Sequence, residues 1–166
     1  MRIIGIDPGL SGAIAVLDDL KIFDMFDMPV MSEGKKNKNQ LNSALLVSIM
    51  KKHILSNGDT FVIVEQVSAM PGQGVTSMFN FGQTFGAIKG ICASLNLPIF
   101  YVRPTKWKKH FELINASKDA SRTKVIEMYP SISDRLRKKK DVNKACLLYT
   151  SPSPRDVEES RMPSSA

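Results

Sequence analysis

The sequence predicts an α/β fold with a mixed five-stranded sheet flanked by helices. Short apolar runs at residues 2–6, 13–17 and 20–26 follow one another closely, and the tight turns between them indicate antiparallel strands. Two further strands, expected at 61–64 and 98–102, alternate with helical patterns. Hairpins followed by strand–helix–strand units predict a sheet that is antiparallel in one part and parallel in the other, with helices on both faces.

The longest helical pattern covers residues 75–95 and follows a loop expected at 66–74. Its glycines recur every four residues, which predicts a smooth ridge that lies close to the sheet: Gly82, Gly86 and Gly90. An apolar stripe between Leu41 and Ile54 predicts an earlier helix. Three further helices are expected, at 104–111, at 118–129 and from about Arg137. A loop is expected at 31–39.

Composition restricts the possible function classes. The 166 residues and 18.4 kDa suit one domain, and 43% hydrophobic residues suffice for a core. A net charge of +7 and a pI of about 9.5 favour a polyanionic partner. Two cysteines cannot make a disulfide framework. No apolar stretch approaches the roughly 20 residues of a membrane span, and we find no secretory leader, so we expect a cytoplasmic protein without a membrane partner.

Two carboxylates end strand-like runs. Asp7 follows the first run and opens the turn Pro8-Gly-Leu-Ser-Gly12, and Glu65 ends the run from Phe61. Because ligands in such sheets collect at the carboxyl ends of parallel strands, we expect both acids at one site. The glycines would let a phosphate approach the backbone. Carboxylates suit a divalent cation, although Asp-Pro-Gly is also ordinary turn chemistry.

Four motifs occur in a characteristic order and spacing: residues 3–12, 62–65, 102–108 and 138–145. Together they resemble the RuvC-type Holliday junction resolvases, especially the phage-encoded branch, within the ribonuclease H-like superfamily. The resemblance covers residues 1–145. It implies a ribonuclease H-like fold and a homodimeric, magnesium-dependent endonuclease of DNA recombination and repair that nicks two strands of a four-way DNA junction.

The resemblance also implies which residues bind the metal. Such proteins carry one acid on the first strand, one on the fourth and a close pair on the final helix, and Asp7 and Glu65 match the first two. Asn143 falls on the first position of the pair, Cys146 falls on the last, and Asp141 lies just before them as a further candidate. Two Mg²⁺ ions, with Mn²⁺ as a substitute, would be bridged by Asp7. Since Cys146 cannot replace a carboxylate, we expect this chain to fold but to cleave poorly.

The segment from Cys146 to Ala166 changes abruptly in composition. It is rich in serine and proline without helical or strand periodicity, as in a disordered tail. Residues 146–156 also look like the in-frame translation of a sequencing-library adapter, followed by an index at 157–159 and the adapter end. We therefore predict a nuclease domain over 1–145, truncated in its last helix, and a non-native or disordered tail over 146–166, with an acid at position 146 in the natural gene.

Basic residues are dense in the second half of the chain, where they can follow DNA phosphates. The predicted contacts are Lys106, Lys108, Lys109, Lys118, Arg122, Arg137, Lys138, Lys139 and Lys140. The cluster around Arg137 can also be read as a solvated charged face. Phe79 is a candidate to stack on an opened base, with helix core as the stronger alternative. Trp107 and Cys92 are expected in the core, and His53 and His110 as surface or hydrogen-bonded residues.

Two other functions fit part of the sequence. An ATP-binding fragment of the sugar-kinase and actin type shares the strand-Asp-x-Gly start, but it needs a second glycine-rich phosphate turn and leaves Glu65 unexplained. A protein that binds junctions without cutting them fits a chain in which Cys146 replaces the last carboxylate.

Overall fold

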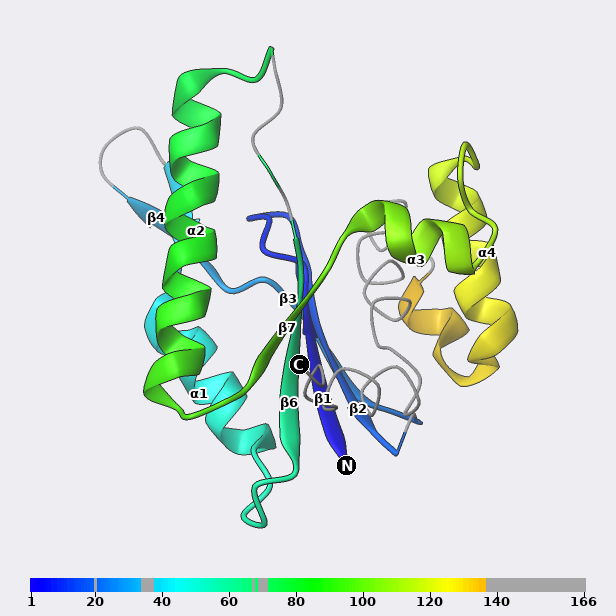
Figure 1. Ribbon diagram of the computed structural model, residues 1–166, viewed down its shortest axis with the longest axis horizontal. Helices are drawn as coiled ribbons and strands as arrows, with labels where there is room; N and C mark the ends of the chain where they lie inside the picture. The colour runs from blue at the N-terminus through cyan, green and yellow to red at the C-terminus, as the bar shows by residue number, and fades with distance from the viewer. Residues whose placement is uncertain (20, 34–37, 67, 69–71, 137–166) are drawn as a thin grey trace, which may run out of the picture.

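A computed structural model of the chain describes residues 1–19, 21–33, 38–66, 68 and 72–136 (Figure 1). Within these residues five strands form one sheet in the order β3-β2-β1-β6-β7. Their bounds are β1 (Arg2–Ile6), β2 (Ala13–Asp18), β3 (Lys21–Asp27), β6 (Thr60–Glu65) and β7 (Ile99–Val102). The predicted mixed sheet is confirmed, because β1 pairs antiparallel with β2 and parallel with β6, which in turn pairs parallel with β7.

The centre of the sheet consists of strands that are apolar on both faces. Every residue of β1 is buried, and so are the first five residues of β2 and of β6. Such unbroken apolar runs are typical of strands covered by helices on both sides. The edge strand β3 instead alternates between exposed and partly buried residues, and its register with β2 shifts between Val16 and Leu17. An unbroken apolar run therefore indicates a central strand, and an alternating pattern indicates an edge strand.

Helices cover the two faces of the sheet. On one face lie α1 (Ser43–His53) and α2 (Val75–Ser94), and on the other α3 (Pro104–His110), α4 (Lys118–Met128) and the 3₁₀ segment η1 (Pro130–Leu136) (Figure 1). Side chains alternate along β1, so that Ile3 and Ile4 point to opposite cores. Among the described helices, none has both the length and the apolarity required to cross a bilayer.

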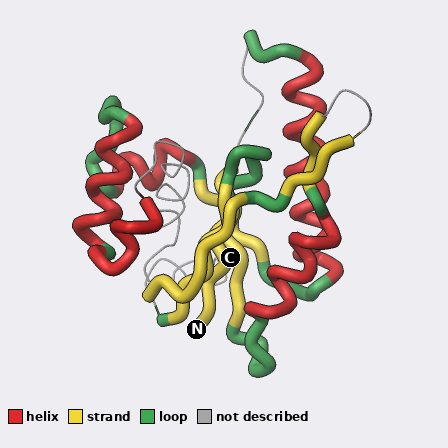
Figure 2. Tube along the Cα trace, turned by 180° about the vertical axis from the view of Figure 1, so that it is seen from behind, coloured by secondary structure: helices red, strands yellow, loops and turns green. Residues whose placement is uncertain are grey.

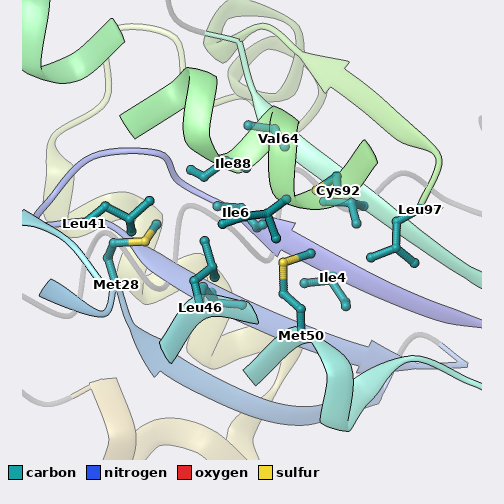
Figure 3. Close-up of a cluster of buried hydrophobic side chains, with 13 residues drawn as sticks. Ile4, Ile6, Met28, Leu41, Leu46, Met50, Val64, Ile88, Cys92 and Leu97 are labelled. Atoms are coloured by element: carbon teal, nitrogen blue, oxygen red, sulfur yellow. The ribbon is translucent and has the colours of Figure 1, made fainter. Parts of the chain in front are cut away.

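The core under α1 and α2 holds these helices on β1 and β6. Ile4 and Ile6 of β1 contact the same cluster as Leu46 and Met50 of α1 and Ile88 of α2 (Figure 3). Cys92 is fully buried in this cluster, as predicted. The side chain of Asn42 caps α1 by accepting a hydrogen bond from the backbone N–H of Leu45, at 3.0 Å.

The prediction of a loop at 31–39 is wrong in part, because the two strands of a second small sheet occupy most of this segment. Strands β4 (Val30–Glu33) and β5 (Lys38–Leu41) pair antiparallel as a hairpin, which Figure 2 shows beside the longest helix. Met28 and Leu41 at the base of the hairpin are buried in the core shared by α1 and α2. The hairpin is thus held by apolar contacts at its base, while the polar composition of its strands hid it from sequence analysis.

The glycine ridge of α2 does not face the sheet, contrary to the prediction. Side chains added at Gly82, Gly86 and Gly90 would meet nothing within 4 Å. The buried side of α2 instead carries larger residues, Thr84, Ile88, Ile91 and Cys92. Phe79 is 64% exposed, so the preferred assignment to the helix core is also wrong. The spacing of the glycines identified one side of α2, but the larger apolar side chains on the other side determined which side is buried.

His53 likewise departs from the expectation of a surface or hydrogen-bonded residue. It is buried against Phe23 and Phe26 of the edge strand, with ring centroids 5.8 and 5.5 Å away, and its Nδ1 has no hydrogen-bond partner. His110 is exposed, as expected. The last predicted helix, from about Arg137, lies outside the described residues.

Replacing Gly90 with alanine should stabilise the protein, because alanine favours a helix interior by about 1 kcal/mol over glycine and the added methyl meets no neighbour. The measurement is the free energy of unfolding in urea, at a concentration where the chain is monomeric. As a control, Gly58→Ala should destabilise, since Gly58 has a φ of 76°. A loss of stability in Gly90→Ala would mean that the ridge is packed against another element.

Candidate metal site and nucleic-acid interface

Asp7 stands directly after β1, and backbone contacts fix its position. Its N–H donates to the carbonyl of Ala13 at 3.0 Å, which extends the β1–β2 ladder by one residue. Its carboxylate Oδ1 accepts the N–H of Gly9, also at 3.0 Å. The side chain is half-buried, and this burial raises the pKa of Asp7, while the hydrogen bond from Gly9 opposes the rise.

The turn after Asp7 requires glycine at position 12. The N–H of Gly12 donates to the carbonyl of Gly9 at 2.8 Å, which folds the turn back over Asp7. A Cβ atom on Gly12 would lie 2.3 Å from the backbone oxygen of Asp7 and 2.9 Å from its carboxyl carbon. We expected the glycines to admit a phosphate to the backbone; for Gly12 the structure gives a different reason, the close approach of the turn to Asp7.

Glu65 is the last residue of β6 and lies beside Asp7. Because Ile6 pairs with Val64 in the parallel ladder, the next residues along the two strands, Asp7 and Glu65, leave the sheet together. Burial first, and then the negative charge of Asp7, raise the pKa of Glu65 above its ordinary value. The predicted meeting of these two acids at one end of the sheet is therefore what the strand register produces.

Two residues of α3 complete the surroundings of Glu65. The indole N–H of Trp107 donates to Oε1 of Glu65 at 3.4 Å, and this contact lowers the pKa of Glu65 against the effect of burial. The nearby Lys108 acts in the same direction, and its ammonium lies 5.5 Å from the centre of the Trp107 ring. Trp107 is buried, as predicted, but sequence analysis missed its contact with Glu65.

The described residues fit one divalent cation. Asp7 and Glu65 offer hard carboxylate oxygens that repel each other without a positive charge between them. Mg²⁺ is typically bound by one or two carboxylates together with waters and phosphate oxygens. Within the described part of the chain no group of three or more acidic, histidine or cysteine side chains could hold a metal. Asp141, the third predicted ligand, lies outside the described residues, as do Asn143, predicted to be catalytic, and Cys146.

Several of the predicted DNA-contacting basic residues lie on α3 and α4. Helix α3 begins just after β7, whose carboxyl end is paired with Glu65, and it presents exposed Lys106, Lys108 and Lys109. Farther along the chain, Lys118 begins α4, and Arg122 is partly buried with an ion pair to Asp119 at 3.5 Å. The other four predicted contacts lie outside the described residues: Arg137, Lys138, Lys139 and Lys140.

The strand order and the placement of the helices define a class of fold. A mixed sheet in the order β3-β2-β1-β6-β7, covered by helices on both faces, is a ribonuclease H-like fold. Neither a protein-family model nor a curated protein sequence matches the chain.

Solved structures with this fold include RuvC of Thermus thermophilus. The structure of that protein in complex with a Holliday junction substrate aligns with this chain at a TM-score of 0.62 and 15% identity. The alignment covers 90% of this chain and 91% of the RuvC chain. A second structure of T. thermophilus RuvC gives a TM-score of 0.53 at 15% identity, covering 90% and 92%. At this identity the likeness establishes the fold.

Alanine at Gly12 should destabilise the protein and disturb Asp7, because the added methyl group collides with the backbone and carboxyl group of that residue. We expect Gly12→Ala to lower the free energy of unfolding in urea by about 1–3 kcal/mol. The matched control is Gly9→Ala, whose methyl group would lie 3.4 Å from Oδ1 of Asp7 and should cost less than about 1 kcal/mol. Equal losses in the two variants would contradict this explanation.

Proposed function

We propose that this protein is a metal-dependent, structure-selective endonuclease that resolves four-way DNA junctions, that is, a crossover junction endodeoxyribonuclease. The observation that carries the proposal is the pairing of Asp7 with Glu65 at the carboxyl ends of β1 and β6, in a fold that the chain shares with a RuvC solved in complex with a Holliday junction substrate. The sequence motifs around both acids support the same activity.

Asp7 and Glu65 would hold Mg²⁺, or Mn²⁺ in its place. When bound, divalent cations activate a water molecule and stabilise the leaving oxygen of a phosphodiester. The residues of this chain contribute by fixing the carboxylates: Gly9 donates to Asp7, and the strand register sets Glu65 beside it. Asp141 is the proposed ligand of a second ion, and Asn143 is proposed as a further catalytic residue.

Branched DNA suits the charge of this surface. The exposed lysines of α3 belong to the same short helix as Trp107, which contacts Glu65, so a DNA backbone drawn to them would come near the acid pair. Arg122 and the basic cluster from Arg137 to Lys140 would extend this contact. Phe79 is exposed near the start of α2, where it is available to stack on an unpaired base. We further propose that the protein acts in the cytoplasm of a bacterium or phage-infected host.

A homodimer completes the proposal, since a four-way junction has two symmetric strands to cut. The exposed side of α2 supports it: Val75 is 85% exposed, and Gly86 farther along the helix leaves room for close approach. Sedimentation should give twice 18.4 kDa for the unmodified 166-residue chain. It should give the monomer mass for Gly86→Glu, whose carboxylate would be buried in the interface. An unchanged dimer in that variant would place the interface elsewhere.

The nuclease proposal predicts metal-dependent nicking of a synthetic four-way junction. Asp7→Asn should slow nicking at least about 100-fold, because a misplaced metal costs that much, while junction binding without metal is kept. The matched control is Asp19→Asn, the same chemical change in the turn between β2 and β3, where Asp19 pairs with the amino terminus at 2.9 Å. That variant should nick at the rate of the unmodified chain.

The residue at position 146 provides a second prediction. Cys146→Asp should raise the nicking rate by about 100-fold or more, because it restores the carboxylate that the family pattern has there. Equal rates with cysteine and aspartate would contradict the need for this ligand. Junction binding without nicking in either chain would identify a non-catalytic binding protein, and calorimetric ATP binding would instead favour the kinase and actin class.

A further inference from the structure

Trp107 joins the core to the acid pair. The residue is 3% exposed, and it packs in the cluster that contains Ile3, Val125 and Leu136. Its indole N–H meanwhile donates to Oε1 of Glu65 at 3.4 Å, across 42 residues of sequence. A residue needed only for packing has no reason to direct its single polar atom to a carboxylate that is itself half-buried.

The backbone leaves Trp107 little freedom. Strand β7 pairs with β6 so that Val102 lies opposite Glu65, and the chain turns into α3 directly afterwards, with Pro104 in the first turn. The backbone N–H of Phe111 donates to the carbonyl of Trp107 at 3.1 Å, at the end of this short helix. The backbone of Trp107 is thereby fixed by α3, while its side chain is held in the core.

We propose that Trp107 is a positioning residue that restricts the rotamers of Glu65 and keeps its carboxylate beside Asp7, ready for the metal ion. This inference rests on the proposed function, in which Glu65 is a metal ligand. A glutamate has three rotatable bonds, so holding one oxygen limits where the other can lie. Groups that orient a metal ligand typically change metal affinity 10–100-fold when removed. At 3.4 Å the contact is long for a hydrogen bond, so its expected effect is on the order of the lower end of this range.

Trp107 is the one tryptophan of the chain, which gives the proposal a direct optical readout. Indole emission responds to the charge and hydrogen bonding at its N–H. Titration of the full-length chain with Mg²⁺ should therefore change the Trp107 fluorescence in a saturable way. In Glu65→Gln the Mg²⁺-dependent change should disappear, because the carboxylate that couples the ion to the indole is gone. A saturable change that persists in Glu65→Gln would overturn the proposal.

Trp107→Phe tests the N–H itself, because it keeps an aromatic ring in the core. The measurement is the Mg²⁺ concentration that gives half of the maximal rise in Tm, and we expect it to increase about tenfold. Nicking by the Cys146→Asp chain carrying this change should need correspondingly more Mg²⁺ but recover at saturating metal. A purely structural role would instead lower the rate at every Mg²⁺ concentration.

Leu113→Ala is the matched control, since Leu113 is buried in the same cluster as Trp107. It should lower Tm without moving the half-maximal Mg²⁺ concentration. If Trp107→Phe also leaves that concentration unchanged while Glu65→Gln abolishes the Mg²⁺ effect, Trp107 is only a core residue and the metal site stands. If Mg²⁺ changes neither fluorescence nor Tm of the unmodified chain, this inference and the proposed metal site fall together.

Discussion

The parallel pairing of β1 with β6 brings two half-buried carboxylates side by side, and the rest of the site is arranged around this unfavourable contact. Burial raises the pKa of both Asp7 and Glu65, and the charge of Asp7 raises that of Glu65 further. Each acid has a compensating donor, the N–H of Gly9 for Asp7 and the indole of Trp107 for Glu65. Functional sites often hold such groups at a cost to stability, which a bound cation offsets.

The two cores make this arrangement rigid. Ile3 points to the core under α3 and α4, and Ile4 points to the core under α1 and α2. A slip of β1 by one residue would exchange these faces and move Asp7 away from Glu65, so the packing that stabilises the fold also specifies the register. The catalytic proposal thus depends on hydrophobic contacts that lie well inside the molecule.

The charge distribution places a small acidic site beside basic residues. The chain carries a net charge of +7, and the lysines of α3 stand exposed on the helix that contacts Glu65 through Trp107. A polyanion is drawn to the basic surface as a whole, while Asp7 and Glu65 alone would repel it. A divalent cation would remove this conflict, which is the physical reason behind the proposal that DNA and metal bind together.

The sequence by itself determined the strands of the main sheet, the longest helix and the acid pair. These features follow from local patterns: an unbroken apolar run is a buried strand, and a carboxylate at its end must emerge at the edge of the sheet. Fold class and the positions of Asp7 and Glu65 could therefore be predicted.

Only the tertiary structure decided which side of each element meets a neighbour. The glycines of α2 face away from the sheet because Ile88 and Cys92 fill the other side. The β4–β5 hairpin is held through Met28 and Leu41 by a core formed largely by other segments. The contact between Trp107 and Glu65 spans 42 residues, so no local pattern could reveal it. Such contacts depend on how separate elements pack, and packing is a property of the whole chain.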